Sequence, residues 1–341
     1  MSLDTSDSGA LALSKIGLGC GVFGGAYGPA SQADIVATVR AALGSGITLM
    51  DTSPYYNDSE AKLGTALHAL RAEFPRSTYA ICTKLGRYGV HKADFDYSAA
   101  RVGASVAESM RRLRTDYLDI VLCHDVEFVA LEQVVDVALP ALFALKKKGL
   151  VRQVGISGYP LDVLVRIART QHERGCPLDV CLSYCNLNLH CRRLPAYLPM
   201  LRSAGVKTVV AASPLSMGLL SQGPTPAWHP ASDELKAAVQ RCAGLVSAFA
   251  RKQRPSSAPV SLAQMAEHFA FSFDSVDVHL VGAKTGAEVG CMLAAHVQAQ
   301  TLQLGAGGKY ADAGLQQLHE QIQRILEPFA EYTWPSPPPD A

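Results

Sequence analysis

The sequence predicts an α/β fold in which eight parallel strands close into a (β/α)8 TIM barrel. Two observations carry this prediction. Short β-branched or apolar runs alternate with amphipathic helical stretches along the whole chain, a rhythm typical of parallel sheets. The alternation repeats eight times, and eight strands can close into a barrel whose centre is filled by side chains. With 341 residues, 48% of them hydrophobic and 18% charged, the chain can fill such a core.

The strands and helices are located by the period of their apolar residues. Strands are expected at 15–19, 48–50, 79–83, 118–123, 151–156, 180–183, 207–211 and 279–281. Helices are expected at 33–43, 60–72, 99–112, 131–148, 161–174, 194–204, 262–271 and 287–297. Ser31 is placed to cap the first helix, and three glycines are placed to end helices, namely Gly44, Gly149 and Gly205.

Two segments fall outside this alternation. Residues 222–253 follow the seventh strand with a Pro-rich loop and an extra helical stretch, and residues 305–328 add another helix before a WPSPPP tail. Such additions commonly cover the active-site face of a barrel. No linker divides the chain. Residues 1–341 are therefore expected to be one domain, with the barrel core at about 15–300 and the C-terminal helix and tail at 305–341.

The composition argues against nucleic-acid and membrane partners. The net charge is +1, and Lys and Arg are scattered rather than clustered. The most apolar window, 134–145, is too short to cross a bilayer. The first residues lack the charged and apolar regions of a signal peptide, and the odd number of cysteines, nine, favours reduced thiols. A cytoplasmic location and a small-molecule substrate are expected, and the oligomeric state stays open.

A glycine-rich stretch imitates a different nucleotide-binding motif. Residues 19–24 read G-C-G-V-F-G after the first strand, as in dinucleotide-binding sheets. That fingerprint requires the next helix to begin at the glycines, so that its N-terminus faces the pyrophosphate. Here Pro29 and Ser31 place the helix start later. The glycines are instead expected to form a flexible loop over the barrel mouth.

Three ionisable residues end successive predicted strands: Asp51, Lys84 and His124. In a barrel these ends converge on one face, and Tyr56, in the loop after Asp51, can point over the same place. A phenol titrates near 10 in water, so an ammonium at Lys84 is expected to lower the pKa of Tyr56 and make it a better base. Asp51 would keep Lys84 charged, and His124 would hydrogen-bond the reacting oxygen.

Each of these residues taken alone has a structural explanation, as a helix cap, a solvated charge, a packing tyrosine or a core histidine. Their joint placement at compatible strand ends favours proton transfer that accompanies hydride transfer between a carbonyl and an alcohol.

Six stretches around these residues resemble the aldo-keto reductase family. They are DTSPYYNDSEAKLGTAL (51–67), ICTKLGR (81–87), DYLDIVLCHD (116–125), VGISGYP (154–160), AASPLSMGLL (211–220) and HLVGAKTGAEV (279–289). The resemblance runs nearly the whole length of the chain. It implies a barrel, a nicotinamide cofactor bound in an extended conformation, and a catalytic tetrad at Asp51, Tyr56, Lys84 and His124.

Within that family, the chain is similar to plant and fungal aldose dehydrogenases that act on L-galactose and D-arabinose. FDYSAARV (95–102), CHDVEF (123–128), LSYCN (182–186), AWHPASDELK (227–236) and TWPS (333–336) carry this likeness. It implies NAD-dependent oxidation of an aldose at the anomeric carbon to an aldonolactone. L-galactose to L-galactono-1,4-lactone, on a route to ascorbate, is the favoured reaction, and D-arabinose and L-fucose stay open as substrates.

The resemblance also implies where the cofactor binds. Ser157 should bind the carboxamide, and the stretch that should follow the pyrophosphate contains Ser213, Leu215 and Met217. The residues that should surround the adenosine half are Gly282, Ala283, Lys284, Thr285 and Glu288. The chain departs from the family pattern at three places: Gly158 replaces Asn, Ala212 replaces an aromatic residue, and 182–186 lacks a Gln.

Glu288 favours NAD over NADP. NADP-using relatives place Arg there to meet the 2′-phosphate, whereas a carboxylate would repel that phosphate and accept hydrogen bonds from free ribose hydroxyls. Lys284 nearby partly offsets the repulsion. The alternative is that Glu288 is a solvated residue in the first turn of its helix.

Three other interpretations have less support. Cys181, Cys185, His190 and Cys191 fit no common zinc spacing, so no metal is expected. A general NADP-dependent aldehyde reductase is an alternative enzyme, against which residues 227–236 and Glu288 argue. A regulatory barrel that accompanies a channel belongs to a different class, and no sequence feature favours it.

Overall fold

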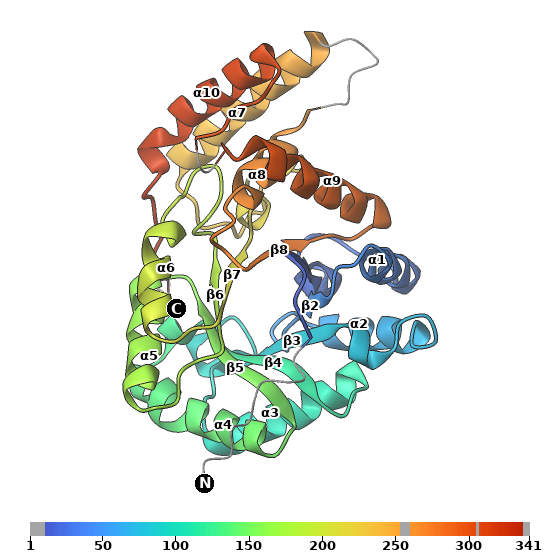
Figure 1. The fold of residues 1–341 in the computed structure, drawn as a ribbon, viewed down its shortest axis with the longest axis vertical. Helices are drawn as coiled ribbons and strands as arrows, with labels where there is room; N and C mark the ends of the chain where they lie inside the picture. The colour runs from blue at the N-terminus through green and yellow to red at the C-terminus, as the bar shows by residue number, and fades with distance from the viewer. Residues whose placement is uncertain (1–10, 253–259, 305–306, 337–341) are drawn as a thin grey trace.

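The computed structural model describes residues 11–252, 260–304 and 307–336. Eight parallel strands form a closed barrel in chain order, with the first strand paired to the last (Figure 1). They are β1 (Ile16–Gly19), β2 (Leu49–Asp51), β3 (Ala80–Leu85), β4 (Leu118–His124), β5 (Val151–Gly158), β6 (Val180–Tyr184), β7 (Thr208–Ala212) and β8 (Val278–Gly282). The predicted barrel is confirmed, and each strand lies within a residue or two of its expected position.

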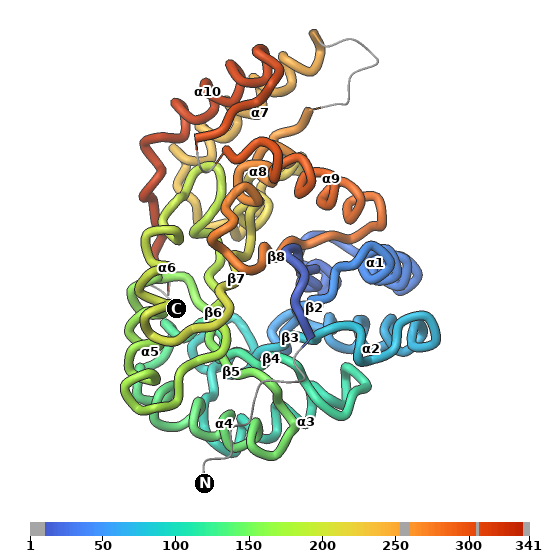
Figure 2. Tube along the Cα trace, in the orientation of Figure 1, coloured from blue at the N-terminus to red at the C-terminus, as the bar shows by residue number. Residues whose placement is uncertain are grey.

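The helices lie outside the strands, as Figure 1 shows. They are α1 (Gln32–Gly44), α2 (Ser59–Ala69), α3 (Ala99–Leu113), α4 (Leu139–Lys147), α5 (Leu161–Glu173), α6 (Leu194–Ser203), α7 (Asp233–Lys252), α8 (Leu262–Phe271), α9 (Gly286–Leu302) and α10 (Ala313–Leu326). The extra helices expected after the seventh strand and near the C-terminus are α7 and α10. They pack on each other beyond α8, where both the ribbon and the Cα trace place them side by side (Figure 2).

The predicted helix ends are mostly confirmed. The Ser31 side chain accepts a hydrogen bond from the Asp34 N–H and caps α1, while Gly149 and Gly205 take positive φ values of 77° and 78° after α4 and α6. Gly44 is the last residue of α1, as expected. The left-handed conformation that follows the helix is adopted two residues later by Gly46, with φ 83°. Glycine is the residue that takes this conformation most readily.

Two further segments differ from expectation. The helix predicted over 131–148 begins with a π-helical turn, Gln133–Ala138, before α4. Pro140 has no N–H to donate to the carbonyl four residues earlier, so the regular α-helical pattern is interrupted there. The glycine-rich stretch is a 3-10 turn, Cys20–Gly24, with Cys20 and Phe23 buried, rather than a flexible loop. The start of α1 at Gln32 confirms that the glycines do not open a helix.

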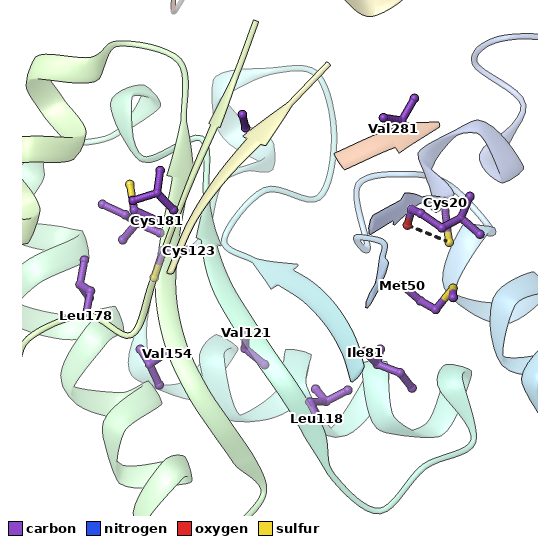
Figure 3. Packing of buried hydrophobic residues seen from close by; sticks show 14 of the residues in the cluster. Cys20, Met50, Ile81, Leu118, Val121, Cys123, Val154, Leu178, Cys181 and Val281 are labelled. Atoms are coloured by element: carbon purple, nitrogen blue, oxygen red, sulfur yellow. Dashed lines mark hydrogen bonds between the residues drawn. The ribbon is translucent and has the colours of Figure 1, made fainter. Parts of the chain in front are cut away.

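Side chains alternate between two parts of the core. Along β4, Ile120 and Leu122 lie in the cluster at the barrel centre, whereas Val121 and Cys123 lie in the cluster between strands and helices. Figure 3 shows part of that outer cluster, including Val121 and Cys123. Continuing the two-residue period of a strand, His124 follows the inward-facing set. The same period turns the last polar residues of β2 and β3 toward the barrel mouth.

Carboxylates stabilise the opposite end of the barrel. Three aspartates near the starts of alternate strands accept the backbone N–H of a neighbouring strand, in the pairs Asp119–Ile81, Asp179–Val154 and Asp277–Val209. Each of these carboxylates also pairs with a basic side chain. Polar groups at the N-terminal face of a TIM barrel generally serve stability rather than catalysis. None of the helices in the described ranges has the length and apolarity that a membrane span requires.

Candidate active site

The four residues predicted to act together lie in one cluster at the C-terminal ends of β2, β3 and β4. Lys84 Nζ is 2.6 Å from Asp51 Oδ1 and 2.9 Å from the Thr52 carbonyl oxygen. The Lys84 and Asp51 side chains are only 2% and 4% exposed. Lys84 Nζ also lies 4.9 Å from the centre of the Tyr56 ring, which in turn lies 5.7 Å from the His124 ring at 88°.

The glycine-rich 3-10 turn after β1 holds Tyr56 in place. A Cβ atom on Gly24 would lie 2.2 Å from the Tyr56 carbonyl oxygen, and one on Gly21 would lie 3.3 Å from the Tyr56 ring. Only glycine permits the first of these approaches, because a Cβ at that distance would overlap the Tyr56 backbone. The turn therefore packs against the ring and the backbone of Tyr56. The sequence did not reveal this role.

Burial and charge act on the Tyr56 phenol in opposite directions. Burial raises the pKa of Tyr56 to about 12, while the charge of Lys84 and a hydrogen bond with it lower that pKa. The effect expected of Lys84 therefore has the predicted sign, but the net pKa lies above that of a free phenol. The expectation of a lowered pKa left out the cost of placing a phenolate in a buried site.

Two other ionisable residues of the cluster, Lys84 and His124, have well-defined charge states. Burial lowers the pKa of Lys84, but Asp51 and Tyr56 more than offset that effect and the net pKa is raised, so Lys84 is an ammonium. Burial, with Lys84 and Arg87 adding to it, lowers the pKa of His124 well below its usual range. His124 is therefore a neutral imidazole. It can donate one hydrogen bond without carrying a charge.

A second charged cluster borders the tetrad and was not predicted. Arg87 lies 2.5 Å from Asp125 Oδ2 and 3.0 Å from Tyr55 Oη, and its guanidinium stacks 3.8 Å from the centre of the Tyr55 ring. Asp125 Oδ2 lies 3.6 Å from His124 Nε2. Burial raises the pKa of Asp125, while Arg87 lowers it. These residues were inside the motifs used for the family resemblance, but no spacing rule pointed to their contact.

The C-terminal tail forms another wall of this region. Trp334 stacks on Tyr159, just after β5, with ring centres 4.8 Å apart and planes 3° apart. The Ser336 hydroxyl donates to Glu127 Oε1 at 2.8 Å, and the Tyr159 N–H donates to the same atom at 3.1 Å. Burial, with Asp125 adding to it, raises the pKa of Glu127 to about 8.

Glu127 also gives a physical reason for one departure from the family pattern. A Cβ atom on Gly158 would lie 2.5 Å from Glu127 Oε2. Any larger residue at this position would therefore collide with the carboxyl group unless Glu127 moved. The missing side chain at Gly158 and the buried Glu127 form a matched pair. The sequence showed the glycine but not the residue that fills its space.

The residues expected to bind the cofactor follow the rim of the barrel from β5 to β8. Ser157 is buried at the end of β5, in register with His124 on β4. After β7, Ser213 and Met217 have left-handed backbones, with φ 63° and 50°. Leu215 lies between them and precedes the 3-10 turn Ser216–Gly218. Backbone with residues in the left-handed conformation often lines anion sites.

The segment after β8 is built around the start of α9. The Thr285 side chain accepts the Glu288 N–H at 3.2 Å, and Glu288 Oε2 accepts the Lys284 N–H at 2.6 Å. Lys284 Nζ donates to the Tyr27 carbonyl oxygen at 2.9 Å, which joins this segment to the loop after β1. Gly282 ends β8, and Ala283 is buried. Glu288 is thus an exposed first-turn residue whose carboxylate completes the helix cap.

One polar group at the end of β6 was not predicted. Asn186 Nδ2 donates to the Tyr159 carbonyl and to Ser183 Oγ, at 2.8 and 2.9 Å. Its Oδ1 is buried and has no partner among the described residues. A ligand amide could satisfy this acceptor. The family pattern indicated a missing Gln in this stretch but no role for Asn186.

The cysteine and histidine cluster near β6 has no metal-binding arrangement. Within the described residues, no three His, Cys, Asp or Glu side chains gather as a metal site would require. His190 instead hydrogen-bonds Ser216 Oγ at 2.8 Å through Nε2. All nine cysteines are free.

Comparison with known proteins identifies the family of the chain. The model of the aldo/keto reductase family matches residues 15–300. The L-galactose dehydrogenase of Arabidopsis thaliana is 38% identical over 330 residues, which cover 96% of this chain and 94% of that protein. The D-arabinose 1-dehydrogenase of Saccharomyces cerevisiae is 43% identical over 238 residues, covering 69% of this chain and 68% of that protein.

A solved structure shows the same fold. An aldo-keto reductase from Bacillus halodurans superimposes with a TM-score of 0.62 at 24% identity, covering 92% of this chain and 95% of that one. At this identity the likeness concerns the barrel alone. The family match, by contrast, covers most of the chain, and the first relative spans nearly all of it. The chain therefore belongs to the aldo/keto reductase family of oxidoreductases.

Proposed function

We propose that the protein oxidises an aldose at its anomeric carbon to an aldonolactone, with a nicotinamide cofactor as the hydride acceptor. The observation that carries this proposal is the buried cluster of Tyr56, Lys84, Asp51 and His124 at the barrel mouth. Family membership makes redox chemistry between carbonyl and alcohol the expected reaction. The named activities of the two relatives, on L-galactose and D-arabinose, point to a sugar.

The chain's own residues manage the proton. Loss of a hydride from a carbinol carbon requires loss of the hydroxyl proton, and Tyr56 Oη is the acceptor. Lys84 stabilises the phenolate, and Asp51 keeps Lys84 charged and in position. His124, neutral and beside Tyr56, donates a hydrogen bond to the same substrate oxygen and fixes its direction. The bound cofactor supplies the electrophilic carbon that takes the hydride.

The rim from β5 to β8 fits an extended dinucleotide. Ser157 and the unpartnered Asn186 Oδ1 could hold a carboxamide, which offers both an acceptor and a donor. The left-handed backbone around Ser213 and Met217, together with Leu215, would follow the pyrophosphate. The start of α9 would meet the adenosine half, through Gly282, Ala283, Lys284, Thr285 and Glu288.

We favour NAD over NADP because Glu288 places a carboxylate at the start of α9. A 2′-phosphate there would be repelled, and free ribose hydroxyls could donate to the carboxylate. Its role in capping α9 is compatible with this. Glu288→Arg is expected to shift the ratio of kcat/KM values toward NADP, and an unchanged ratio would remove the argument. Glu288→Gln separates the loss of charge from the gain of a cation.

The polar residues beside the tetrad favour a polyhydroxylated substrate. Arg87, Asp125 and Tyr55 place charged and hydroxyl groups next to His124. They pair with one another, and the donors and acceptors that remain on these groups could bind the hydroxyls of a sugar. This argues against a general NADP-dependent aldehyde reductase. L-galactose, oxidised to L-galactono-1,4-lactone on an ascorbate route, is the favoured substrate, with D-arabinose and L-fucose as alternatives. A cytoplasmic enzyme formed as one domain by residues 1–341 completes the proposal.

The test is NADH or NADPH formation by the purified protein across a panel of aldoses and simple alcohols. Tyr56→Phe is expected to lower kcat/KM by about 100- to 10,000-fold, the usual range for loss of a general acid or base. Tyr197→Phe is a matched control, since it removes a phenol that donates to Asp162 between the outer helices α5 and α6. Activity on no aldose would contradict the sugar assignment, and full activity of Tyr56→Phe would contradict the mechanism.

A further inference from the structure

A buried serine, Ser53, contacts the Nδ1 atom of His124. Ser53 follows β2 and is fully buried. Its Oγ lies 3.1 Å from His124 Nδ1, and it also accepts the Tyr55 N–H at 3.1 Å. Neither the family resemblance nor the strand pattern singled out this residue. Its position between the backbone before Tyr56 and the ring of His124 connects two parts of the site.

The hydrogens in this contact can be assigned by counting donors and acceptors. A serine hydroxyl has one hydrogen and two lone pairs, and a neutral imidazole has one N–H. The Tyr55 N–H already uses one lone pair of Ser53 Oγ. If His124 Nδ1 carried the proton and donated to Ser53, the serine hydrogen would have no acceptor among the described residues. If Ser53 donates to Nδ1 instead, both groups are satisfied and the His124 proton lies on Nε2.

A second, independent contact favours the same arrangement. His124 Nε2 lies 3.6 Å from Asp125 Oδ2. An N–H at Nε2 is attracted to that carboxylate, whereas a lone pair at Nε2 would be repelled by it. Burial and the cations Lys84 and Arg87 keep the ring neutral, so only one of its nitrogens is protonated. The contacts of Nδ1 and of Nε2 therefore favour the same tautomer.

We propose that Ser53 is a positioning residue that fixes the tautomer of His124, with the proton on Nε2. The assignment of the proton rests on these two contacts and on the neutral charge of the ring. Its consequence for catalysis rests on the proposed function. In that reaction the substrate oxygen must give its proton to Tyr56 while it accepts a hydrogen bond from His124. The opposite tautomer would present a lone pair to that oxygen and compete with Tyr56 for its proton.

The direct test is ¹⁵N NMR of protein labelled at histidine. The His124 signals are identified by their loss in His124→Gln. The expected result is a pyridine-like Nδ1 and a pyrrole-like Nε2 in the wild type. Ser53→Ala should weaken this assignment and populate the other tautomer, and Ser53→Thr, which keeps a hydroxyl, should restore it. Thr52→Val is the matched control, because its hydroxyl bonds Ser59 rather than His124.

Activity gives a second measurement. Ser53→Ala is expected to lower kcat for aldose oxidation by about tenfold, the order expected for loss of one hydrogen bond, with a smaller change in KM. A wild type whose His124 carries its proton on Nδ1 overturns the proposal, even if the alanine variant fails to fold. So does a folded Ser53→Ala protein whose His124 signals match the wild type. Absence of sugar oxidation would contradict the proposed function and leave the NMR result standing.

Discussion

Glu127 should make the stability of this protein depend on pH in a way that one substitution removes. Its carboxyl is held by the Tyr159 N–H and the Ser336 hydroxyl, both on Oε1, while Oε2 is buried without a partner among the described residues. Burial and the nearby Asp125 raise its pKa from the ordinary 4.5 to about 8. Between these values the folded protein keeps a proton that the unfolded chain has lost.

The sign and size of the effect follow from that difference. Because the folded state binds more protons in this interval, the free energy of unfolding falls as pH rises, by at most about 1.4 kcal/mol for each pH unit. Across the interval from 4.5 to about 8 the loss approaches 5 kcal/mol. Glu127→Gln keeps an oxygen for the two donors but cannot ionise. The variant should therefore gain stability relative to wild type as pH rises, and the gain should level off above about pH 8.

The assay is thermal unfolding of both proteins at a series of pH values from 5 to 9, roughly spanning this interval. The relevant quantity is the difference in Tm between variant and wild type, since the titrating groups that do not interact with Glu127 cancel. At about 2 °C for each kcal/mol, the difference should change by several degrees. Glu132→Gln removes one negative charge at an exposed site nearby and serves as the control. A Tm difference for Glu127→Gln that stays constant with pH would refute the reasoning.

Three further predictions concern the barrel mouth and its opposite face. Lys84→Met should lower the free energy of unfolding, measured in urea, by about 3 to 5 kcal/mol because Asp51 stays buried without its cation. Adding Asp51→Asn to this variant should recover stability but not activity. If stability did not recover, the importance of the Lys84–Asp51 ion pair would be contradicted. Gly24→Ala should lower kcat/KM about tenfold while the circular dichroism spectrum stays native, since the new Cβ would lie 2.2 Å from the Tyr56 carbonyl oxygen. Unchanged kinetics would show that the 3-10 turn after β1 does not position Tyr56. Asp179→Leu should lower the free energy of unfolding by about 1 to 3 kcal/mol without changing kcat, because the buried N–H of Val154 loses its acceptor. A lower kcat with unchanged stability would contradict the structural role of Asp179.

The barrel and the tetrad could be predicted because both depend on periodic or local signals. Strand spacing fixes the parallel sheet, and the two-residue alternation along each strand turns Asp51, Lys84 and His124 toward the same mouth. The end of α1 at Gly44 was predicted as well. The sequence did not show that the left-handed residue after this helix would be Gly46.

The contacts that tune the site could not be read from the sequence. The pKa of Tyr56 depends on how completely the phenol is buried, which no local pattern reports. Ser53 and Glu127 act through partners far along the chain, His124 and Ser336, and such pairs appear only when the loops after different strands meet. Gly158 was visible as a departure from the family pattern, yet its explanation required the position of Glu127.

Trp334 and Ser336 pack against the loops after β4 and β5, and this contact matters for the design of recombinant protein. A fusion partner or affinity tag attached shortly after Ser336 would disturb the stacking of Trp334 on Tyr159 and the hydrogen bond from Ser336 to Glu127. Recombinant versions should therefore carry their tag on the N-terminal side. Truncations that end before Trp334 would remove both the Tyr159 stacking and the Glu127 hydrogen bond, so their activity should not be taken as that of the full chain.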